Sequence, residues 1–199
     1  MGRSSIYLDF WNFTLNLRDL DSEYRLDWFK IADVFTHEAQ VVLGNNEQLS
    51  LQDFNIYGSY SQTQKEVKLY RWATSFLPKV KGARVHFYER KKKKSGPRCP
   101  TCHEHIDVCP KCGASMIGTE EKEIDTLIAT AMLQDGWLGK YDIAILVSSD
   151  RDFIPAINYL RNNGLKTIHA QFGFKGAELS KSCWGRFNIE AILDRIRKK

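Results

Sequence analysis

The sequence lacks any apolar run long enough to cross a membrane. No window approaches the roughly 18 continuous apolar residues that a transmembrane helix needs. The N-terminal residues do not follow a signal-peptide pattern, because Asp9 interrupts the first apolar segment. They also fail the myristoylation pattern, since Ile6 stands where serine or threonine is required. We therefore expect a cytoplasmic protein that does not bind a membrane.

Cysteine is scarce outside one segment. Of five cysteines, Cys183 stands alone and four lie in CPTCHEHIDVCPKC, residues 99–112. Paired Cys-x-x-C motifs in a chain without a secretion signal are typical of metal ligands rather than disulfides. Four thiolates complete the tetrahedral coordination of Zn²⁺, so we expect His103 and His105 to be exposed loop residues. The predicted ligands of this structural zinc ion are Cys99, Cys102, Cys109 and Cys112.

Positive charge is unevenly distributed. The formal net charge is +5, and much of the excess lies in ERKKKKSGPR (89–98) and RIRKK (195–199). A basic surface suits a polyanion such as nucleic acid, although a solvated loop and a solvated tail are the plain alternative. The residues predicted to contact nucleic acid are Arg90, Lys91, Lys92, Lys93, Lys94, Arg98 and Lys111.

Hydrophobic periodicity alternates between strand and helix along the chain. With 199 residues, 43% of them hydrophobic, the chain fits one globular domain with an insertion. The expected strands are 4–9, 54–60, 84–90, 141–149 and 166–172. The expected helices are 24–40, 62–77, 119–137 and 151–164, followed by two short helices after residue 175. This alternation predicts an α/β fold with a central parallel sheet, of order 3-2-1-4-5, covered on both faces.

Acidic residues follow two of the expected strands. Asp9 ends the first strand, while Asp150 and Asp152 follow the fourth. In a 3-2-1-4-5 order these strands are neighbours beside the switch point, where ligands bind in such sheets. Asp125 lies near the start of helix 119–137, at the same rim. Up to four carboxylates would converge there, and a bound Mg²⁺ or Mn²⁺ ion would relieve their repulsion.

Helix capping is the main alternative for these acids. An aspartate at a strand-to-helix turn is most often an N-cap, which would account for Asp150 or Asp152 taken singly. Asp125 could instead interact only with the positive end of the dipole of helix 119–137. The segment FWNF after Asp9 is not typical of a helix start, so capping is not expected of Asp9. Asn12 is either a turn residue or a group that holds a water or a phosphate oxygen.

Three segments carry a family resemblance: YLDFWNF, KEID and VSSDRDFIPAINYLRNNG. They resemble the signature blocks of the NYN domain (LabA-like) of the PIN-like nuclease superfamily. The positions that match its pattern are Asp9, Asn12, Lys122, Asp125, Ser148, Asp150, Asp152 and Phe153. The resemblance covers residues 4–90 and 117–195. Ser149 departs from it, because the family usually has glycine there, and the cysteine-rich insertion is a second departure.

The resemblance implies a Rossmann-like three-layer sandwich, which we expect to be built from residues 1–90 and 117–199. The cysteine spacing, not the resemblance, predicts a four-cysteine zinc ribbon inserted at 91–116. It also implies metal-dependent hydrolysis of RNA, with single strands as the expected substrate. In that case Asp9, Asp125 and Asp150 would be ligands of the Mg²⁺ or Mn²⁺ ion, and Asp152 a ligand or an outer group. Asn12 and Ser149 would position water or phosphate.

Two other functions are compatible with parts of the sequence. A non-catalytic module that binds nucleic acid or protein would not need the full set of acids. A phosphatase of the haloacid dehalogenase type requires Asp-x-Asp after the first strand, which DFW (9–11) does not supply. The sequence leaves open RNA versus DNA, endonuclease versus exonuclease, and the oligomeric state, a homodimer included.

Overall fold

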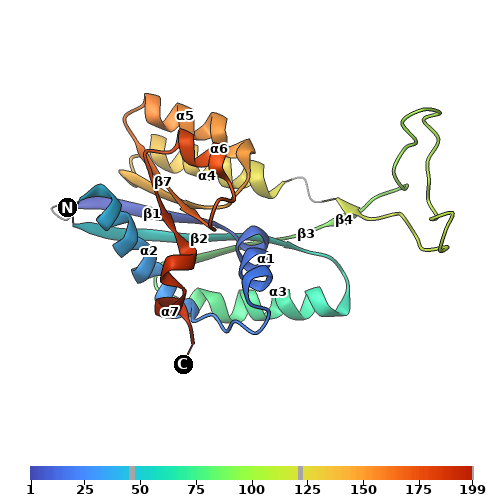
Figure 1. The fold of residues 1–199 in the computed structure, drawn as a ribbon, viewed down its shortest axis with the longest axis horizontal. Helices are drawn as coiled ribbons and strands as arrows, with labels where there is room; N and C mark the ends of the chain where they lie inside the picture. Colours follow the sequence, from blue (N-terminus) through green and yellow to red (C-terminus); the bar gives the residue numbers. More distant parts are fainter. Residues whose placement is uncertain (45–47, 121–122, 199) are drawn as a thin grey trace.

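A six-stranded parallel sheet forms the centre of the molecule (Figure 1). The computed structural model describes residues 1–44, 48–120 and 123–198. The strand order is β3-β2-β1-β6-β7-β8. The strands are β1 (Gly2–Asp9), β2 (Leu49–Tyr60), β3 (Ala83–Glu89), β6 (Ile143–Val147), β7 (Lys166–Gln171) and β8 (Gly185–Asn188). The predicted order 3-2-1-4-5 is confirmed for the first five, and β8 is an additional edge strand.

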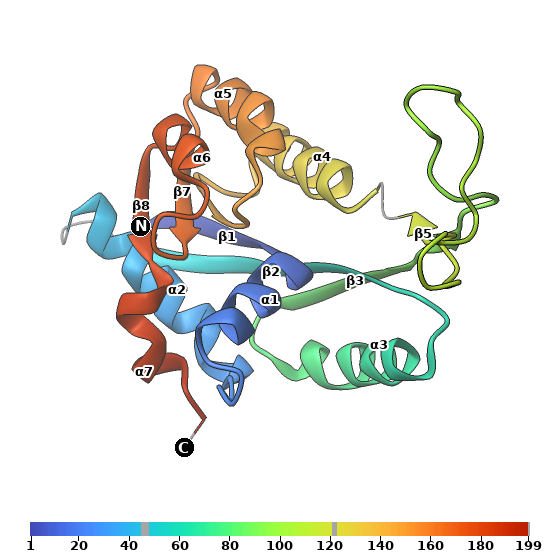
Figure 2. The same ribbon diagram turned by 45° about the vertical axis from the view of Figure 1, so that its right-hand side comes forward.

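Helices cover both faces of this sheet (Figures 1 and 2). One face carries α1 (Phe10–Leu20), α2 (Trp28–Leu43), α3 (Gln64–Phe76) and α7 (Leu193–Ile196). The other carries α4 (Ile124–Trp137), α5 (Ile154–Asn162) and α6 (Ala177–Ser182). Short 3-10 turns are η1 (Leu77–Lys79), η2 (Arg151–Phe153) and η3 (Ile189–Ile192). The three-layer sandwich is therefore confirmed. Within the described ranges, no helix is both long and apolar enough to cross a membrane.

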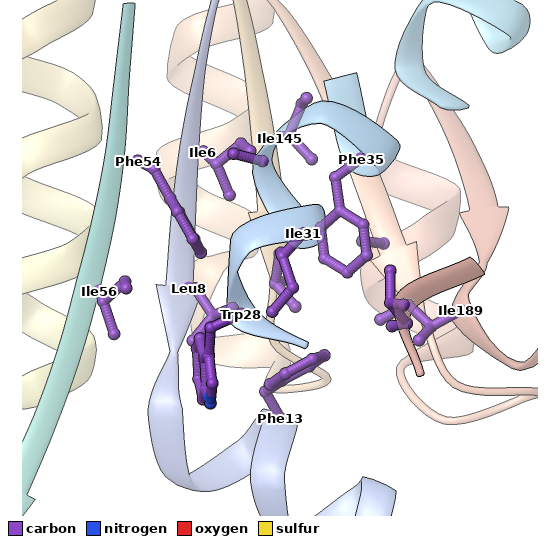
Figure 3. Packing of buried hydrophobic residues seen from close by; sticks show 14 of the residues in the cluster. Ile6, Leu8, Phe13, Trp28, Ile31, Phe35, Phe54, Ile56, Ile145 and Ile189 are labelled. Atoms are coloured by element: carbon purple, nitrogen blue, oxygen red, sulfur yellow. The ribbon is translucent and has the colours of Figure 1, made fainter. Parts of the chain in front are cut away.

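The central strand β1 is buried on both faces. Successive side chains of a strand point to opposite faces, so Ile6 and Leu8 pack in the cluster under α2, while Tyr7 joins the cluster under α4. Figure 3 shows Ile6 and Leu8 beside Ile31 and Phe35 of α2. Burying a side chain of this size contributes roughly 1.5–3 kcal/mol. The two clusters together fix the strand whose last residue is Asp9.

Residues 91–120 leave the sheet and project from the body of the molecule (Figure 1). The strand β4 (Lys91–Lys92) pairs antiparallel with β5 (Thr119–Glu120) and forms a stem. Gly96 is the only residue of 91–119 that is buried. The helix expected from residue 119 begins instead at Ile124, because Thr119 belongs to the stem. The insertion thus has almost no apolar core.

The insertion contains two turns of the same design. The Cys99 amide donates to the Glu104 carbonyl, and the Cys109 amide donates to the Ala114 carbonyl, both at 2.8 Å. Within each turn, a backbone amide also donates to the carbonyl of the first cysteine. The His103 amide donates to the Cys99 carbonyl at 3.0 Å, and the Gly113 amide donates to the Cys109 carbonyl at 2.9 Å. His103 has a positive φ of 61°, and Gly113 has 70° at the equivalent position. We call these turns the first and second knuckle, residues 99–104 and 109–114.

Candidate functional site

Asp9 ends β1 and caps α1. Its Oδ1 accepts a hydrogen bond from the Asn12 amide at 3.1 Å, and its Oδ2 accepts one from Ser148 Oγ at 3.4 Å. The expectation that Asp9 does not cap a helix was therefore wrong, because FWNF does open α1. Leu8 pairs with Val147 of β6, so Asp9 lies beside Ser148 at the carboxyl end of the neighbouring strand. Asp9 therefore caps α1 and also lies next to the segment that carries Asp150.

Asp150 caps the turn η2 after β6. Its Oδ1 accepts from the Asp152 amide at 2.9 Å, and its own amide donates to Ser148 Oγ at 3.3 Å. Ser148 Oγ therefore connects the Asp9 carboxylate with the Asp150 backbone. Oδ2 of Asp150 makes no hydrogen bond to the part of the chain that the structure describes. That oxygen is available to a ligand.

Asn12 fixes the turn that carries Asp150 and Asp152, which we call the acidic turn. Its Oδ1 accepts from the Ser149 amide at 3.1 Å and from Asn16 Nδ2 at 3.0 Å. Lys175 Nζ donates to Asn16 Oδ1 at 2.6 Å and so brings a cation close to the site. The Asn12 Nδ2 group has no hydrogen-bond partner among the described residues. Sequence reasoning identified Asn12 but missed Asn16 and Lys175, which carry no motif.

An open pocket of about 450 Å³ lies beside these groups. Its lining residues are Asn12, Ser149, Asp150, Arg151, Gly176, Ala177, Glu178 and Leu179. Gly176 approaches closely, since a Cβ there would lie 2.9 Å from His169 Cε1 and 3.0 Å from Ser149 Cα. We call this cavity the acidic pocket. It lies at the carboxyl edge of the sheet, where parallel α/β folds bind ligands.

His169 supports the acidic turn from inside the protein. It is fully buried, and its Nε2 donates to the Ser148 carbonyl at 2.8 Å. Its Nδ1 lies 2.6 Å from Ser180 Oγ of α6. Burial lowers the pKa of His169 to about 4, so the ring is neutral at pH 7. Sequence reasoning missed His169; the only signal was its place in the expected strand 166–172.

The remaining predicted acids lie at the same rim. Asp125 is half-buried in the first turn of α4, and Asp152 is exposed in η2, which α4 contacts. Lys122 lies outside the described residues. In the described ranges, no three His, Cys, Asp or Glu side chains lie close enough to bind one metal ion. Coordination by Asp9, Asp125, Asp150 and Asp152 together therefore stays a prediction.

The donors at this rim nevertheless fit a hard divalent ion in kind. They are carboxylate, hydroxyl and amide oxygens, and Mg²⁺ often binds through one or two carboxylates together with waters and substrate phosphates. Asp9 ends β1, and Asp150 lies three residues after the end of the adjacent strand β6. Ser148 Oγ hydrogen-bonds both to the Asp9 carboxylate and to the Asp150 amide.

The knuckle cysteines occur as two pairs. Hydrogen bonds from the amides of Cys102 and Thr101 lower the pKa of Cys99, and those from Cys112 and Lys111 lower the pKa of Cys109. Amides directed at a thiolate suit a metal ligand. His103 and His105 are exposed, as predicted. Because no three ligand groups gather among the described residues, the four-cysteine site also stays a prediction.

The predicted basic residues fall into two groups. Six are exposed on the insertion: Lys91, Lys92, Lys93, Lys94, Arg98 and Lys111. Arg90 differs, because its half-buried guanidinium pairs with Glu66 and lies 5.9 Å above the ring of Trp11. Arg90 is therefore placed to hold β3 against α3, whereas the others face solvent.

The fold and this rim define an α/β protein with an acidic pocket at the carboxyl edge of a parallel sheet. The family model for the NYN domain matches residues 3–189, and the chain belongs to that family. NYN domains are part of the PIN-like nuclease superfamily, are generally nucleases, and usually use Mg²⁺ or Mn²⁺.

A solved structure shares the fold. It is the crystal structure of a protein of unknown function, VPA0982, from Vibrio parahaemolyticus RIMD 2210633. The TM-score is 0.61 at 14% sequence identity, with 99% of this chain and 96% of that chain covered. No curated protein matches.

Proposed function

We propose that this chain is a Mg²⁺- or Mn²⁺-dependent ribonuclease that hydrolyses phosphodiester bonds in single-stranded RNA. One observation carries the proposal: Ser148 Oγ donates to the Asp9 carboxylate and accepts from the amide of Asp150, whose side chain lines the acidic pocket. Membership of a family of nucleases supports the same conclusion. Substrate would enter at the carboxyl edge, where the pocket opens.

The residues of the acidic pocket and its rim would have separate roles. Asp9 and Asp150 would hold the ion, with Asp125 and Asp152 as further ligands or outer groups. When bound, the ion supplies charge neutralisation at the phosphate and a more acidic water. Asn12 Nδ2 and the Ser149 hydroxyl would donate to phosphate oxygens. Lys175 and Asn16 orient Asn12, and His169 orients the Ser148 carbonyl.

In the proposed hydrolysis, a water molecule attacks the phosphorus atom. The bond from phosphorus to the 3′-oxygen breaks, the 3′-oxygen leaves as a hydroxyl, and the phosphate remains on the 5′ side of the next nucleotide. The family resemblance implies this in-line course.

The insertion would act separately from the acidic pocket. We propose that Cys99, Cys102, Cys109 and Cys112 bind one structural Zn²⁺ ion and hold the two knuckles together. The lysines 91–94 at its stem would contact the phosphates of RNA. Residues 91–116 would thus form a zinc-ribbon arm on a nuclease domain built from 1–90 and 117–199.

A non-catalytic module that binds nucleic acid is the competing function. It gains nothing from carboxylates at the binding edge, since these repel phosphate. It would bind RNA without cleaving it under any metal condition.

A cleavage assay separates the two functions. Labelled single-stranded RNA, duplex RNA and single-stranded DNA are incubated with Mn²⁺ and parent, Asp150→Asn or Asp27→Asn protein. Asp27 caps α2 and serves as the matched control. We expect cleavage of single-stranded RNA by the parent and by Asp27→Asn, and loss of at least a hundredfold in Asp150→Asn. Equal cleavage by all three proteins would refute the assignment.

A further inference from the structure

The first turn of α1 separates the acidic pocket from a second cavity. Asn12 lines the acidic pocket, whereas its neighbour Trp11 lines a cavity of about 540 Å³ bounded by α1, α2 and α3. Trp28 and Trp72 also line it, together with Leu69 and several other apolar side chains. We call this the tryptophan pocket. Both cavities therefore open around the residues that directly follow Asp9.

The aromatic walls of the tryptophan pocket are fixed by contacts of their own. Trp11 Nε1 donates to the Ser59 carbonyl at 2.7 Å. The Trp28 ring stacks on Phe10, with centroids 5.9 Å apart and planes within 9°. The Trp72 ring stacks on Phe76 at 5.4 Å. A ligand that enters this pocket meets preformed aromatic surface, so little side-chain entropy is lost on binding.

The polar residues around the pocket favour an anion. Arg18 and Lys65 are exposed and make no ion pair within the described part of the chain. The acids at the same rim are already bound, since Glu66 pairs with Arg90. Asp21 pairs with Arg197 at 3.0 Å. The charge left for a ligand is therefore positive.

We propose that the tryptophan pocket receives one unpaired nucleobase of the RNA strand whose phosphate lies in the acidic pocket. The inference rests on the proposed ribonuclease function and adds a substrate-selecting site to it. Unstacked bases of single strands bind on aromatic side chains, and the cavity has the size of a small-molecule site. A base held in a duplex cannot enter, so the pocket selects single strands. Arg18 and Lys65 would contact the phosphates on either side.

The test is a binding measurement without added Mg²⁺ or Mn²⁺, which keeps it independent of cleavage. Fluorescence anisotropy compares a labelled uridine oligonucleotide with an abasic oligonucleotide of the same length and charge, in a buffer free of chelators. We expect the parent protein to bind the abasic strand about tenfold more weakly, the loss typical of one stacked base. Equal affinities would overturn the proposal.

Two pairs of variants locate the effect. Leu69→Trp fills the pocket and should remove the discrimination between the two strands, whereas Leu20→Trp, on α1 outside the pocket, should retain it. Lys65→Glu should weaken uridine binding severalfold more than Lys68→Glu, which makes the same charge change on α3 away from the pocket. The Lys65 variant does not touch the core and remains informative if Leu69→Trp does not fold.

The possible outcomes distinguish this inference from the ribonuclease assignment. If folded Leu69→Trp still binds the uridine strand more tightly than the abasic strand, the proposal that the tryptophan pocket binds a base is overturned. A protein segment would then be the occupant to test. Base-dependent binding that Leu69→Trp abolishes supports the pocket, even if the parent cleaves no RNA and the ribonuclease assignment fails.

Discussion

At the scale of single residues, Asp9 and Asp150 each perform a structural task that a metal ligand need not perform. Both accept a backbone hydrogen bond as N-caps, through Oδ1 in each case. Asparagine caps helices about as well as aspartate, whereas alanine costs about 1 kcal/mol at such a position. Asparagine, however, removes the negative charge. Substitution therefore separates capping from metal binding.

For Asp9 we expect the two functions to respond differently. Asp9→Asn should keep the free energy of unfolding within about 0.5 kcal/mol of the parent, because the cap is retained, yet abolish Mn²⁺-dependent cleavage. Asp9→Ala should lose activity and also about 1 kcal/mol of stability. Urea unfolding and the RNA assay measure the two effects. An active Asp9→Asn protein would show that Asp9 serves only as a cap.

His169 should make stability depend on pH. Its pKa is lowered from 6.5 to about 4 in the folded state, so the unfolded chain binds more protons between these values. The stability that comes from neutral His169 is complete above pH 6.5 and is lost as the pH falls through about 4. A shift of this size corresponds to at most about 3 kcal/mol.

Urea unfolding at pH 7 and at pH 4.5 measures this contribution. The parent should lose more unfolding free energy over this interval than His169→Gln does. His37→Gln is the control, because His37 is exposed. If parent and His169→Gln show the same pH slope, His169 is not buried in its neutral form.

At the scale of elements, the sequence predicts most of the fold. Periodicity identified β1, β2, β6 and β7, in which most residues are buried, and the half-buried edge strand β3, whose residues alternate between polar and apolar. It missed α1, where the polar residues Asn12, Thr14 and Asn16 lie among apolar ones and the cap is an aspartate that also ends a strand. It missed β8, only four residues long, which is defined by pairing with β7 rather than by a local pattern.

The candidate site could be predicted only in part for the same reason. The acids follow strands and so could be placed at one edge. Lys175 and His169 reach the site through contacts between segments far apart in the sequence, as Lys175 does with Asn16. No local spacing encodes such contacts.

The insertion offers a test of its own. A Cβ on Gly96 would lie 1.9 Å from the Ile106 carbonyl oxygen, whereas one on Gly118 would meet no atom within 4 Å. We expect Gly96→Ala to distort the first knuckle and abolish zinc binding, and Gly118→Ala to retain it. Because the insertion contributes almost nothing to the core, the melting temperature of the main domain should be similar in both.

Zinc content by elemental analysis and melting by circular dichroism measure these outcomes. The prediction is one zinc per parent chain. Parent protein that remains zinc-free after incubation with Zn²⁺ would contradict the four-cysteine site.

At the scale of the whole molecule, a basic arm extends from a body whose binding edge carries the acids. Replacing residues 93–118 by a short glycine–serine link between β4 and β5 removes four cations: Lys93, Lys94, Arg98 and Lys111. RNA binding should weaken, and the slope of log affinity against log salt should fall by about 0.7 for each lost phosphate contact. An unchanged slope would show that the arm does not contact RNA.

Asp9 and Asp150 should bind one divalent ion between the ends of β1 and β6. Electron paramagnetic resonance tests this directly, because the signal of free Mn²⁺ shows how much of the ion is bound when it is titrated into the protein. We expect one Mn²⁺ site per parent chain, lost in Asp9→Asn and Asp150→Asn and kept in Asp27→Asn. Equal Mn²⁺ binding by the parent and both site variants, or none by the parent, would contradict it.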